Sequence, residues 1–256
     1  IFYMKKIKSF AQERTENVSQ MNKDDNINTL GLNFLRDSAD FKYSYNFDWL
    51  SRPIIQYPQD IVATQEIIWK VKPDLIIETG IAHGGSLVLS ASMLSLIDYC
   101  EAIKNGKKID FKKRKVVGID IDIRKHNRIA LEKHPLRSKM TLIEGSSIEK
   151  KIYDKVSKIV KKHKKIMVFL DSNHTHDHVF KELELYAKFV SKKSYCVVFD
   201  TVIEDLDPKI ISNRPWDKGN SPWTALKKFI KKDRKFIIDK NIQKKLLITV
   251  CKDGYL

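Results

Sequence analysis

The chain has 256 residues, 42% of them hydrophobic, and a formal net charge of +16. This length suits one large domain with a packed core, and the composition excludes a disordered or fibrous protein. Because the lysines are dispersed in short runs and arginines are sparse, we expect a solvated basic surface and no nucleic-acid partner, with an anion-attracting face as the alternative.

Residues 1–52 are polar and lack a sustained hydrophobic period, so we interpret them as an N-terminal arm or helical appendage. Residues 53–256 are expected to form the main domain, which begins with a helix over residues 59–70. After Pro73, short apolar runs alternate with longer helical segments. The runs are 75–77, 116–119, 140–143, 166–170 and 195–199, and the helical segments lie near 85–103, 123–134, 147–163 and 176–190.

This alternation predicts a doubly wound, Rossmann-like α/β fold, because repeated strand–helix–strand units produce parallel strands joined by right-handed crossovers. Two later apolar runs, 235–239 and 246–250, are too close in sequence for a crossover helix, so they predict a C-terminal antiparallel hairpin. A mostly parallel sheet that ends in such a hairpin is the class I methyltransferase arrangement.

The three cysteines, Cys100, Cys196 and Cys251, form no CxxC pair and lie in apolar contexts. They are expected to be buried free thiols in a reducing compartment, which favours a cytoplasmic protein. No uninterrupted apolar stretch reaches the roughly 18 residues that a spanning helix needs, so no transmembrane segment is predicted. A homo-oligomer and association with a membrane surface are left open.

Ligands of open parallel sheets bind beyond the carboxyl ends of the strands, and here these ends are polar. The first run ends at Glu78 and a glycine-rich turn that opens the next helix. Glycines let the backbone approach a ligand, and a helix N-terminus favours an anionic group, although a purely structural turn is the alternative. The candidate cofactor-binding residues of this turn are Glu78, Gly80, His83, Gly84 and Ser86.

The second run ends at Asp120 and Asp122. A carboxylate at this place can accept hydrogen bonds from both ribose hydroxyls of a cofactor, and Asp120 is favoured because strand alternation directs Asp122 outward as a helix cap. The alternative is that both carboxylates only cap the helix. After the third run, Ser146 and Ser147 are candidates either for the adenine pocket or for capping.

The fourth run ends at Asp171, followed by His174, and the fifth ends at Asp200 and Thr201. Two carboxylates at neighbouring strand ends can bind one magnesium ion and leave positions for water or substrate oxygens. His174 is a candidate general base because imidazole titrates near neutral pH. Capping by His174 is one alternative, and a zinc or iron site is another, although the His-Glu-x-x-His and His-x-Asp/Glu patterns are missing.

Six motifs in this order resemble the cephalosporin hydroxylase family, which is similar to rhamnosyl O-methyltransferases of glycolipid synthesis. They are residues 80–86, 118–124, 126–128, 144–147, 170–176 and 214–220, and the likeness extends from about Pro53 to the C-terminus. The resemblance implies an O-methyltransferase that uses S-adenosylmethionine and Mg²⁺ or another divalent cation. The implied acceptor is a hydroxyl of a small molecule or glycan, above all a sugar of a surface glycan or glycolipid.

The metal positions are also similar to those of catechol O-methyltransferase. This likeness implies Asp171 and Asp200 as metal ligands, with Thr201 in the place of an amide ligand and His174 in the place of the lysine base. Asp171 is then also a catalytic residue and a neighbour of the cofactor. Because Thr201 and His174 depart from that pattern, Glu204 and Asp205 stay open as substitutes for them.

The segment 204–223 is polar and rich in proline, so we interpret it as a substrate loop or lid. Two rival hypotheses belong to other classes. One is a metal-dependent oxygenase acting on a small molecule such as a β-lactam, and the other is a basic protein that binds nucleic acid without catalysis. The missing oxygenase triad and the dispersed lysines argue against them.

Overall fold

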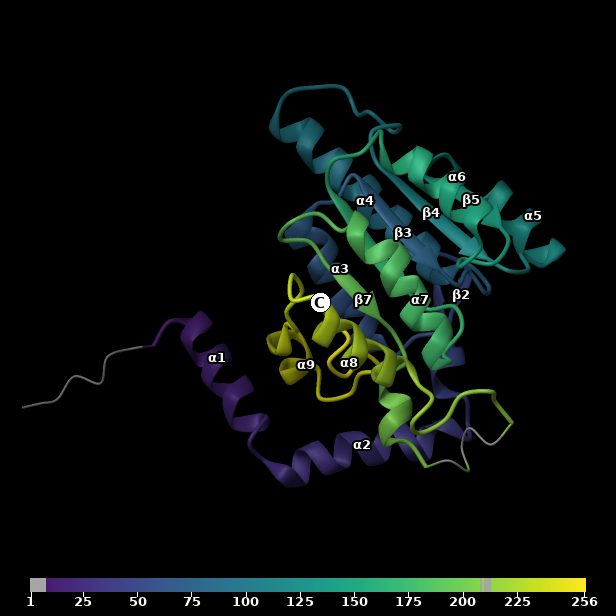
Figure 1. Ribbon diagram of the computed structural model, residues 1–256. Coiled ribbons are helices and arrows are strands. Elements are labelled where there is room, and N and C mark those ends of the chain that lie inside the picture. Colours follow the sequence, from purple (N-terminus) through teal and green to yellow (C-terminus); the bar gives the residue numbers. More distant parts are fainter. Residues whose placement is uncertain (1–7, 208, 210–212) are drawn as a thin grey trace, which may run out of the picture.

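A computed structural model describes residues 8–207, 209 and 213–256 and contains a parallel sheet between layers of helices (Figure 1). Its strands are β3 (Leu75–Thr79), β4 (Lys115–Asp120), β5 (Met140–Glu144), β6 (Ile166–Leu170) and β7 (Cys196–Val198). Their order is β5-β4-β3-β6-β7, and every neighbouring pair is parallel. The predicted doubly wound α/β fold is therefore confirmed, with the strand order reversing between β3 and β6.

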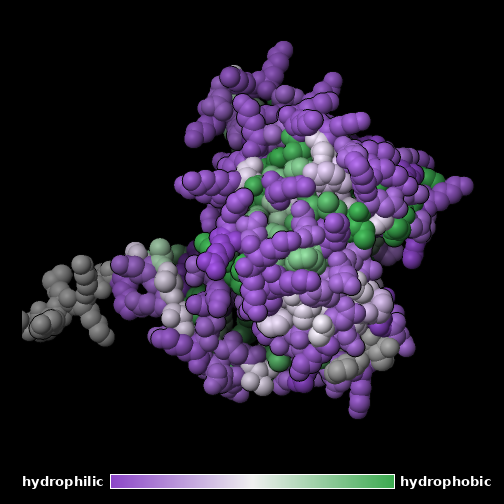
Figure 2. All heavy atoms as spheres, viewed as in Figure 1, coloured by the Kyte–Doolittle hydropathy of each residue, from purple (hydrophilic) through white to green (hydrophobic). Residues whose placement is uncertain are grey.

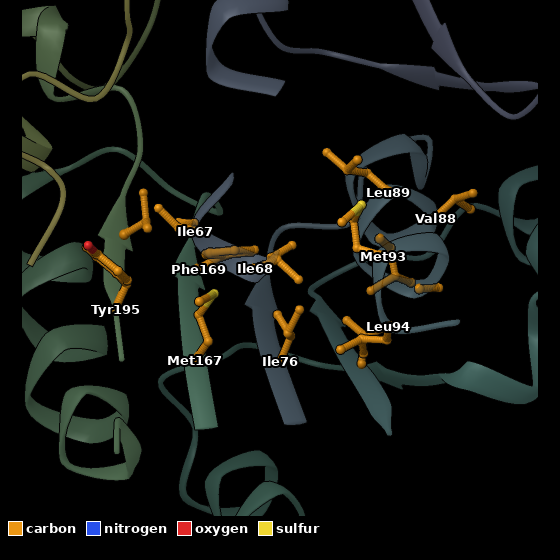
Figure 3. Packing of buried hydrophobic residues seen from close by; sticks show 14 of the residues in the cluster. Ile67, Ile68, Ile76, Val88, Leu89, Met93, Leu94, Met167, Phe169 and Tyr195 are labelled. Carbon is orange, nitrogen blue, oxygen red and sulfur yellow. The ribbon is translucent and has the colours of Figure 1, made fainter. Parts of the chain in front are cut away.

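Helices cover both faces of this sheet because the side chains of each strand alternate between two hydrophobic cores. Ile76, Met167 and Phe169 pack on one face with residues of two helices, as Figure 3 shows. Ile77 and Val168 lie in the core on the other face. The first core includes residues of α3 (Pro58–Val71) and α4 (Gly85–Lys104), and the second includes residues of α6 (Lys150–Val160), α7 (His176–Tyr186) and α8 (Pro222–Lys232). The helix expected over residues 59–70 is α3.

Helix α4 is long and apolar enough, by length and composition, to cross a membrane. However, 56% of its apolar window is buried inside the protein, where it packs against the sheet. Its exposed side carries Leu96, Tyr99 and Ile103. The burial of α4 is that of a core helix.

On the face of the molecule in Figure 2, hydrophilic side chains predominate and hydrophobic ones form separate patches.

The N-terminal segment holds two helices and a small hairpin. The elements are α1 (Phe10–Met21), α2 (Asp25–Ala39), the 3₁₀ turn Tyr43–Tyr45, β1 (Phe47–Trp49) and β2 (Arg52–Ile54). Side-chain caps at Ser9 and Asp24 begin the two helices. No residue of α1 is buried, and this helix lies at the periphery of the protein on the side of α9 (Figure 1).

The predicted C-terminal hairpin does not form. Residues between the two apolar runs fold into α9 (Lys240–Leu246), which Asp239 caps. The second run is held by the buried Asp60, whose carboxylate accepts hydrogen bonds from the Thr249 hydroxyl and, at 3.0 Å, from the Val250 amide. Leu246, Ile248 and Val250 of this run pack, partly buried, against the core. Asp60, in place of a strand partner, satisfies the Val250 amide.

The antiparallel partner of β7 is instead the end of the chain. The amides of Cys196 and Val198 donate to the carbonyls of Leu256 at 3.0 Å and Gly254 at 2.9 Å. A Cβ at Gly254 would lie 2.2 Å from the Val198 carbonyl oxygen, so glycine is needed for this close approach. This pairing covers the β7 edge of the sheet.

Candidate cofactor and metal site

Glu78 lies near the end of β3 and its side chain is almost fully buried, with 2% exposed. The Ser86 hydroxyl donates to one carboxylate oxygen, and the Ser90 hydroxyl donates to the other at 3.4 Å. Burial raises the pKa of Glu78 to about 7, because the loss of hydration outweighs these two hydrogen bonds. No lysine or arginine in the described part of the chain forms an ion pair with it.

The turn after Glu78 brings the ends of two strands together. Gly80 has φ 88°, and a Cβ there would lie only 1.9 Å from the Asp171 carbonyl oxygen. Gly84, the N-cap of α4, also has φ 88° and packs on the side chain of Leu131. The His83 carbonyl accepts a hydrogen bond from Arg52 Nε at 2.9 Å, which ties the turn to β2. Both glycines are thus required by local packing, and their approach to a ligand stays a prediction.

Asp120 ends β4 and holds this same turn. One of its carboxylate oxygens accepts the amides of Ile81 at 2.7 Å and Ala82 at 3.1 Å, and the other accepts the amide of Asp122 at 3.1 Å. Asp122 itself is exposed just beyond the strand. Asp120 therefore fixes the turn that precedes α4, and its predicted role toward ribose would use the remaining lone pairs of the same oxygens.

The two serines after β5 have different surroundings. Ser146 is half-buried, whereas Ser147 is buried and donates to Glu182 Oε1 at 2.5 Å. Ser172 donates to the same oxygen at 2.7 Å, and His178 lies within hydrogen-bond distance of both serines. Ser147 thus faces α7 and links the loops after β5 and β6. The sequence analysis missed this cluster, although a glutamate within the buried stripe of α7 was a signal for it.

Two of the three predicted metal ligands, Asp171 and Asp200, lie together with His174, the predicted base. One ligand atom from each of Asp171, His174 and Asp200 lies within 4.8 Å of the others, and His174 Nε2 is 3.2 Å from Asp200 Oδ2. Asp171 follows β6 and Asp200 follows β7, so the parallel register of these strands brings the two carboxylates to one edge. Two carboxylates and one imidazole offer oxygen and nitrogen donors that suit a divalent cation.

Electrostatic crowding and backbone strain accompany this cluster. Burial, followed by the negative charges of Asp200 and Glu78, raises the pKa of Asp171 well above its usual range. Asp200 has φ 54°, a left-handed conformation that costs a non-glycine residue energy. A bound cation would relieve the repulsion between the carboxylates, so the charges of the site fit a metal.

The other residues considered for metal binding or catalysis have partners elsewhere. Thr201 is fully buried, and its hydroxyl donates to the Val250 carbonyl at 3.2 Å. Glu204 accepts hydrogen bonds from the Ser221 hydroxyl at 2.7 Å and the Gly219 amide at 3.2 Å. Asp205 pairs with Lys252. Among the described residues, His174 is therefore the group that joins the two aspartates at the site.

Part of the expected substrate loop borders His174. The Trp216 ring meets the His174 imidazole edge-on with 4.6 Å between ring centres, and Arg214 lies over the Trp216 ring at 5.5 Å. Asn220 accepts a hydrogen bond from the His176 amide at 2.9 Å, which fastens the loop to the start of α7. Residues 208 and 210–212 of this segment lie outside the described residues.

Two adjoining cavities lie where the strand order reverses, and both are lined by Gln56, Ser86 and Asp171. Glu78 borders the first cavity, and the Gly80 turn and His83 border the second. Gln56 is 5% exposed, and its side-chain oxygen has no hydrogen-bond partner in the described part of the chain. An unpaired acceptor beside two carboxylates fits a polar ligand that carries a positive charge. The sequence analysis did not select Gln56, although a polar residue inside an apolar, proline-flanked segment was a signal.

Comparisons with known proteins agree with this architecture. The family model described as Rhamnosyl O-methyltransferase/CmcI matches residues 41–256. The chain is 30% identical over 141 residues to rhamnosyl O-methyltransferases of Mycobacterium bovis and Mycobacterium tuberculosis, an alignment that covers 54% of this chain and 50% of theirs. The chain thus spans about half the length of these curated relatives.

Two solved structures share the fold. "CmcI-N160 apo-structure" has a TM-score of 0.53 and 14% identity, and "cmcI-D160 Mg-SAM" has a TM-score of 0.51 and 14% identity. Each likeness covers 82% of this chain and 75% of the other. These likenesses show the class I methyltransferase fold. Because the family model matches most of the sequence, the chain belongs to the Rhamnosyl O-methyltransferase/CmcI family.

Proposed function

We propose that this chain is an S-adenosylmethionine-dependent O-methyltransferase, assisted by a divalent cation, that acts on a sugar hydroxyl. The observation that carries the proposal is the position of Asp171, which borders both cavities and also belongs to the cluster with His174 and Asp200. A methyl donor in the cavities and a metal-bound acceptor would meet at this one side chain. Membership in a family whose relatives are rhamnosyl O-methyltransferases supports the same activity.

The residues of the cavities and of the neighbouring strand ends fit the parts of S-adenosylmethionine. We propose that Glu78 and the Gly80–Ser86 turn hold its methionine end and that Asp120 and Asp122 bind the ribose. Ser146 would border the adenine, whereas the Ser147 hydroxyl already donates to Glu182. When bound, this cofactor supplies an electrophilic methyl group on a sulfonium. We also propose residues 53–256 as the methyltransferase domain and residues 1–52 as an appendage to it.

Asp171 and Asp200 would hold Mg²⁺ or a similar cation, with water or the acceptor oxygen in the remaining positions. When bound, the cation supplies a Lewis acid that lowers the pKa of the acceptor hydroxyl and orients it. His174 would accept the hydroxyl proton, and the charge of Asp200 at 3.2 Å would stabilise the resulting imidazolium. The transfer forms a carbon–oxygen bond and breaks the carbon–sulfur bond, whose electrons stay on sulfur.

Trp216 supports a sugar as the acceptor. Its indole ring is half-buried beside His174, and the apolar C–H face of a sugar ring packs well on such a surface. The exposed Arg214 next to it can donate hydrogen bonds to hydroxyl or anionic groups of the acceptor. We propose a surface glycan, a glycolipid or a precursor of one as the source of this sugar.

A second role of His174 is favoured by a specific observation. Its imidazole lies close enough to both aspartates to bind the metal as a third ligand. In that case His174 would not act as the base. A non-haem iron triad needs two histidines and one carboxylate, and the described cluster has the reverse composition. The donor set therefore favours metal-assisted methyl transfer over an oxygenase.

The activity can be tested with methyl-labelled S-adenosylmethionine and a panel of sugar acceptors that includes rhamnosides and nucleotide-linked rhamnose. We expect label in a sugar ether when Mg²⁺ is present and little transfer when a chelator is present. Mass spectrometry of the product would locate the methyl group. Undiminished transfer in chelator would contradict metal assistance, and binding of NAD without binding of S-adenosylmethionine or its demethylated product would contradict the activity itself.

The buried Glu78 predicts a pH-dependent affinity for the cofactor. Its carboxyl has a pKa of about 7 and must be ionised to accept a hydrogen bond from the cofactor's ammonium group. Below that pKa the dissociation constant should rise about tenfold per pH unit, because binding then requires the loss of a proton. Calorimetry in buffers of different ionisation enthalpy should show proton release on binding. Glu78→Gln should bind more weakly with a flat pH profile, and a flat profile for the unsubstituted protein would refute this role.

A further inference from the structure

Gln56 presents an unusual buried group to the cavities. It lies between β2 and α3 and is 5% exposed, yet its side-chain oxygen accepts no hydrogen bond from any described residue. A buried acceptor without a partner costs about 1–3 kcal/mol. Such a group is expected to have a partner in the state in which the protein works.

The backbone that leads into Gln56 is held by two sets of contacts. Arg52 donates to the His83 carbonyl at 2.9 Å and to Asn127 Oδ1 at 2.8 Å, which joins β2 to the glycine turn and to α5 (Lys125–Lys133). A Cβ at Gly85 would lie 2.3 Å from the Pro53 carbonyl oxygen, so this segment packs directly on the start of α4. These contacts place the segment beside the glycine turn, and Gln56 lines both cavities there.

The chemistry of the lining identifies the missing partner. The chain has a net charge of +16, yet the residues that line the two cavities include Glu78 and Asp171 and no lysine or arginine. The Gln56 oxygen adds a neutral acceptor to these carboxylates. An ammonium group offers three N–H donors and one positive charge, which suits several acceptors that surround one point.

We infer that the Gln56 side-chain oxygen accepts a hydrogen bond from the α-ammonium group of the cofactor's methionine part and shares that group with Glu78. This inference rests on the proposed function, since it requires S-adenosylmethionine in the cavities. Gln56 then acts as a binding residue that recognises the amino acid end of the cofactor. Its contribution should be absent for ligands that lack the ammonium group.

The test compares three ligands by calorimetry. S-adenosylhomocysteine carries the ammonium and carboxylate, its desamino analogue keeps only the carboxylate, and 5′-methylthioadenosine lacks both. Gln56→Met preserves the length of the side chain and removes the acceptor. We expect this variant to bind S-adenosylhomocysteine about 10- to 100-fold more weakly, the range for a lost hydrogen bond to a charged group. Its affinities for the desamino analogue and for 5′-methylthioadenosine should stay within about twofold of the unsubstituted protein.

Gln59→Met is the matched control. The Gln59 side-chain oxygen is also buried without a described partner, but Gln59 lines neither cavity, so no affinity should change. Normal binding of 5′-methylthioadenosine by Gln56→Met would show that the variant is folded. Equal losses for all three ligands, or no loss for S-adenosylhomocysteine, would overturn the inference. Failure of the unsubstituted protein to bind any of them would instead overturn the proposed function, and the inference with it.

Discussion

Asp171→Asn will lower methyl transfer by a factor on the order of 10³ or more while leaving the unliganded protein at least as stable as before. The substitution removes a negatively charged oxygen ligand, and a metal that acts as Lewis acid contributes several kcal/mol to the transition state. The same substitution should raise the stability of the metal-free protein or leave it unchanged. The pKa of Asp171 is raised in the folded protein, so at neutral pH its carboxyl destabilises the metal-free fold, and a neutral amide removes that cost.

Turnover with saturating Mg²⁺ and thermal unfolding in chelator would measure the two effects separately. Asp200→Asn should lose activity in the same way, because it belongs to the same cluster. Asp177→Asn is the matched control, since it removes an exposed carboxylate from the first turn of α7 and should leave turnover unchanged. The metal role of Asp171 would be excluded by an Asp171→Asn enzyme with normal activity, or by one whose affinity for Mg²⁺ is unaltered.

His174→Ala should lower turnover by about 10²- to 10⁴-fold, the range for removal of a general base, with partial recovery at high pH. The recovery is expected because hydroxide takes over the proton once the base is absent. If His174 acts as the base, calorimetric affinity for the metal should change little. If it is instead the third ligand, suggested by its place between the aspartates, metal affinity should fall and high pH should not restore activity.

His163→Ala is the matched control. His163 precedes β6, at the amino-terminal ends of the strands, and its imidazole is 3.7 Å from Asp74. This variant should keep both metal affinity and turnover. A His174→Ala enzyme that also keeps both would remove His174 from the mechanism. The acceptor proton would then have to pass directly to solvent or to a group contributed by the substrate.

The strands and their polar ends could be predicted from the sequence for a simple physical reason. Parallel strands that are buried on both faces form continuous apolar runs, so residues 166–170 match β6 in full. Because the carboxyl ends of parallel strands meet at one edge, the sequence also predicted that Asp171 and Asp200 lie together. Both conclusions rest on the hydrophobic pattern of single segments. They could therefore be drawn without knowing which side chains from distant segments are in contact.

The tertiary structure alone decided which partner each polar group has. Hydrophobicity could not distinguish a strand from a partly buried segment that forms none, so residues 246–250 were predicted as half of a hairpin although Asp60 accepts the Val250 amide. Likewise, Ser147 turned toward Glu182, Trp216 came to lie against His174, and Gln56 was left unpaired in the cavities. Each outcome depends on the register and packing of segments far apart in the chain, which set hydrogen-bond distances that no local pattern encodes.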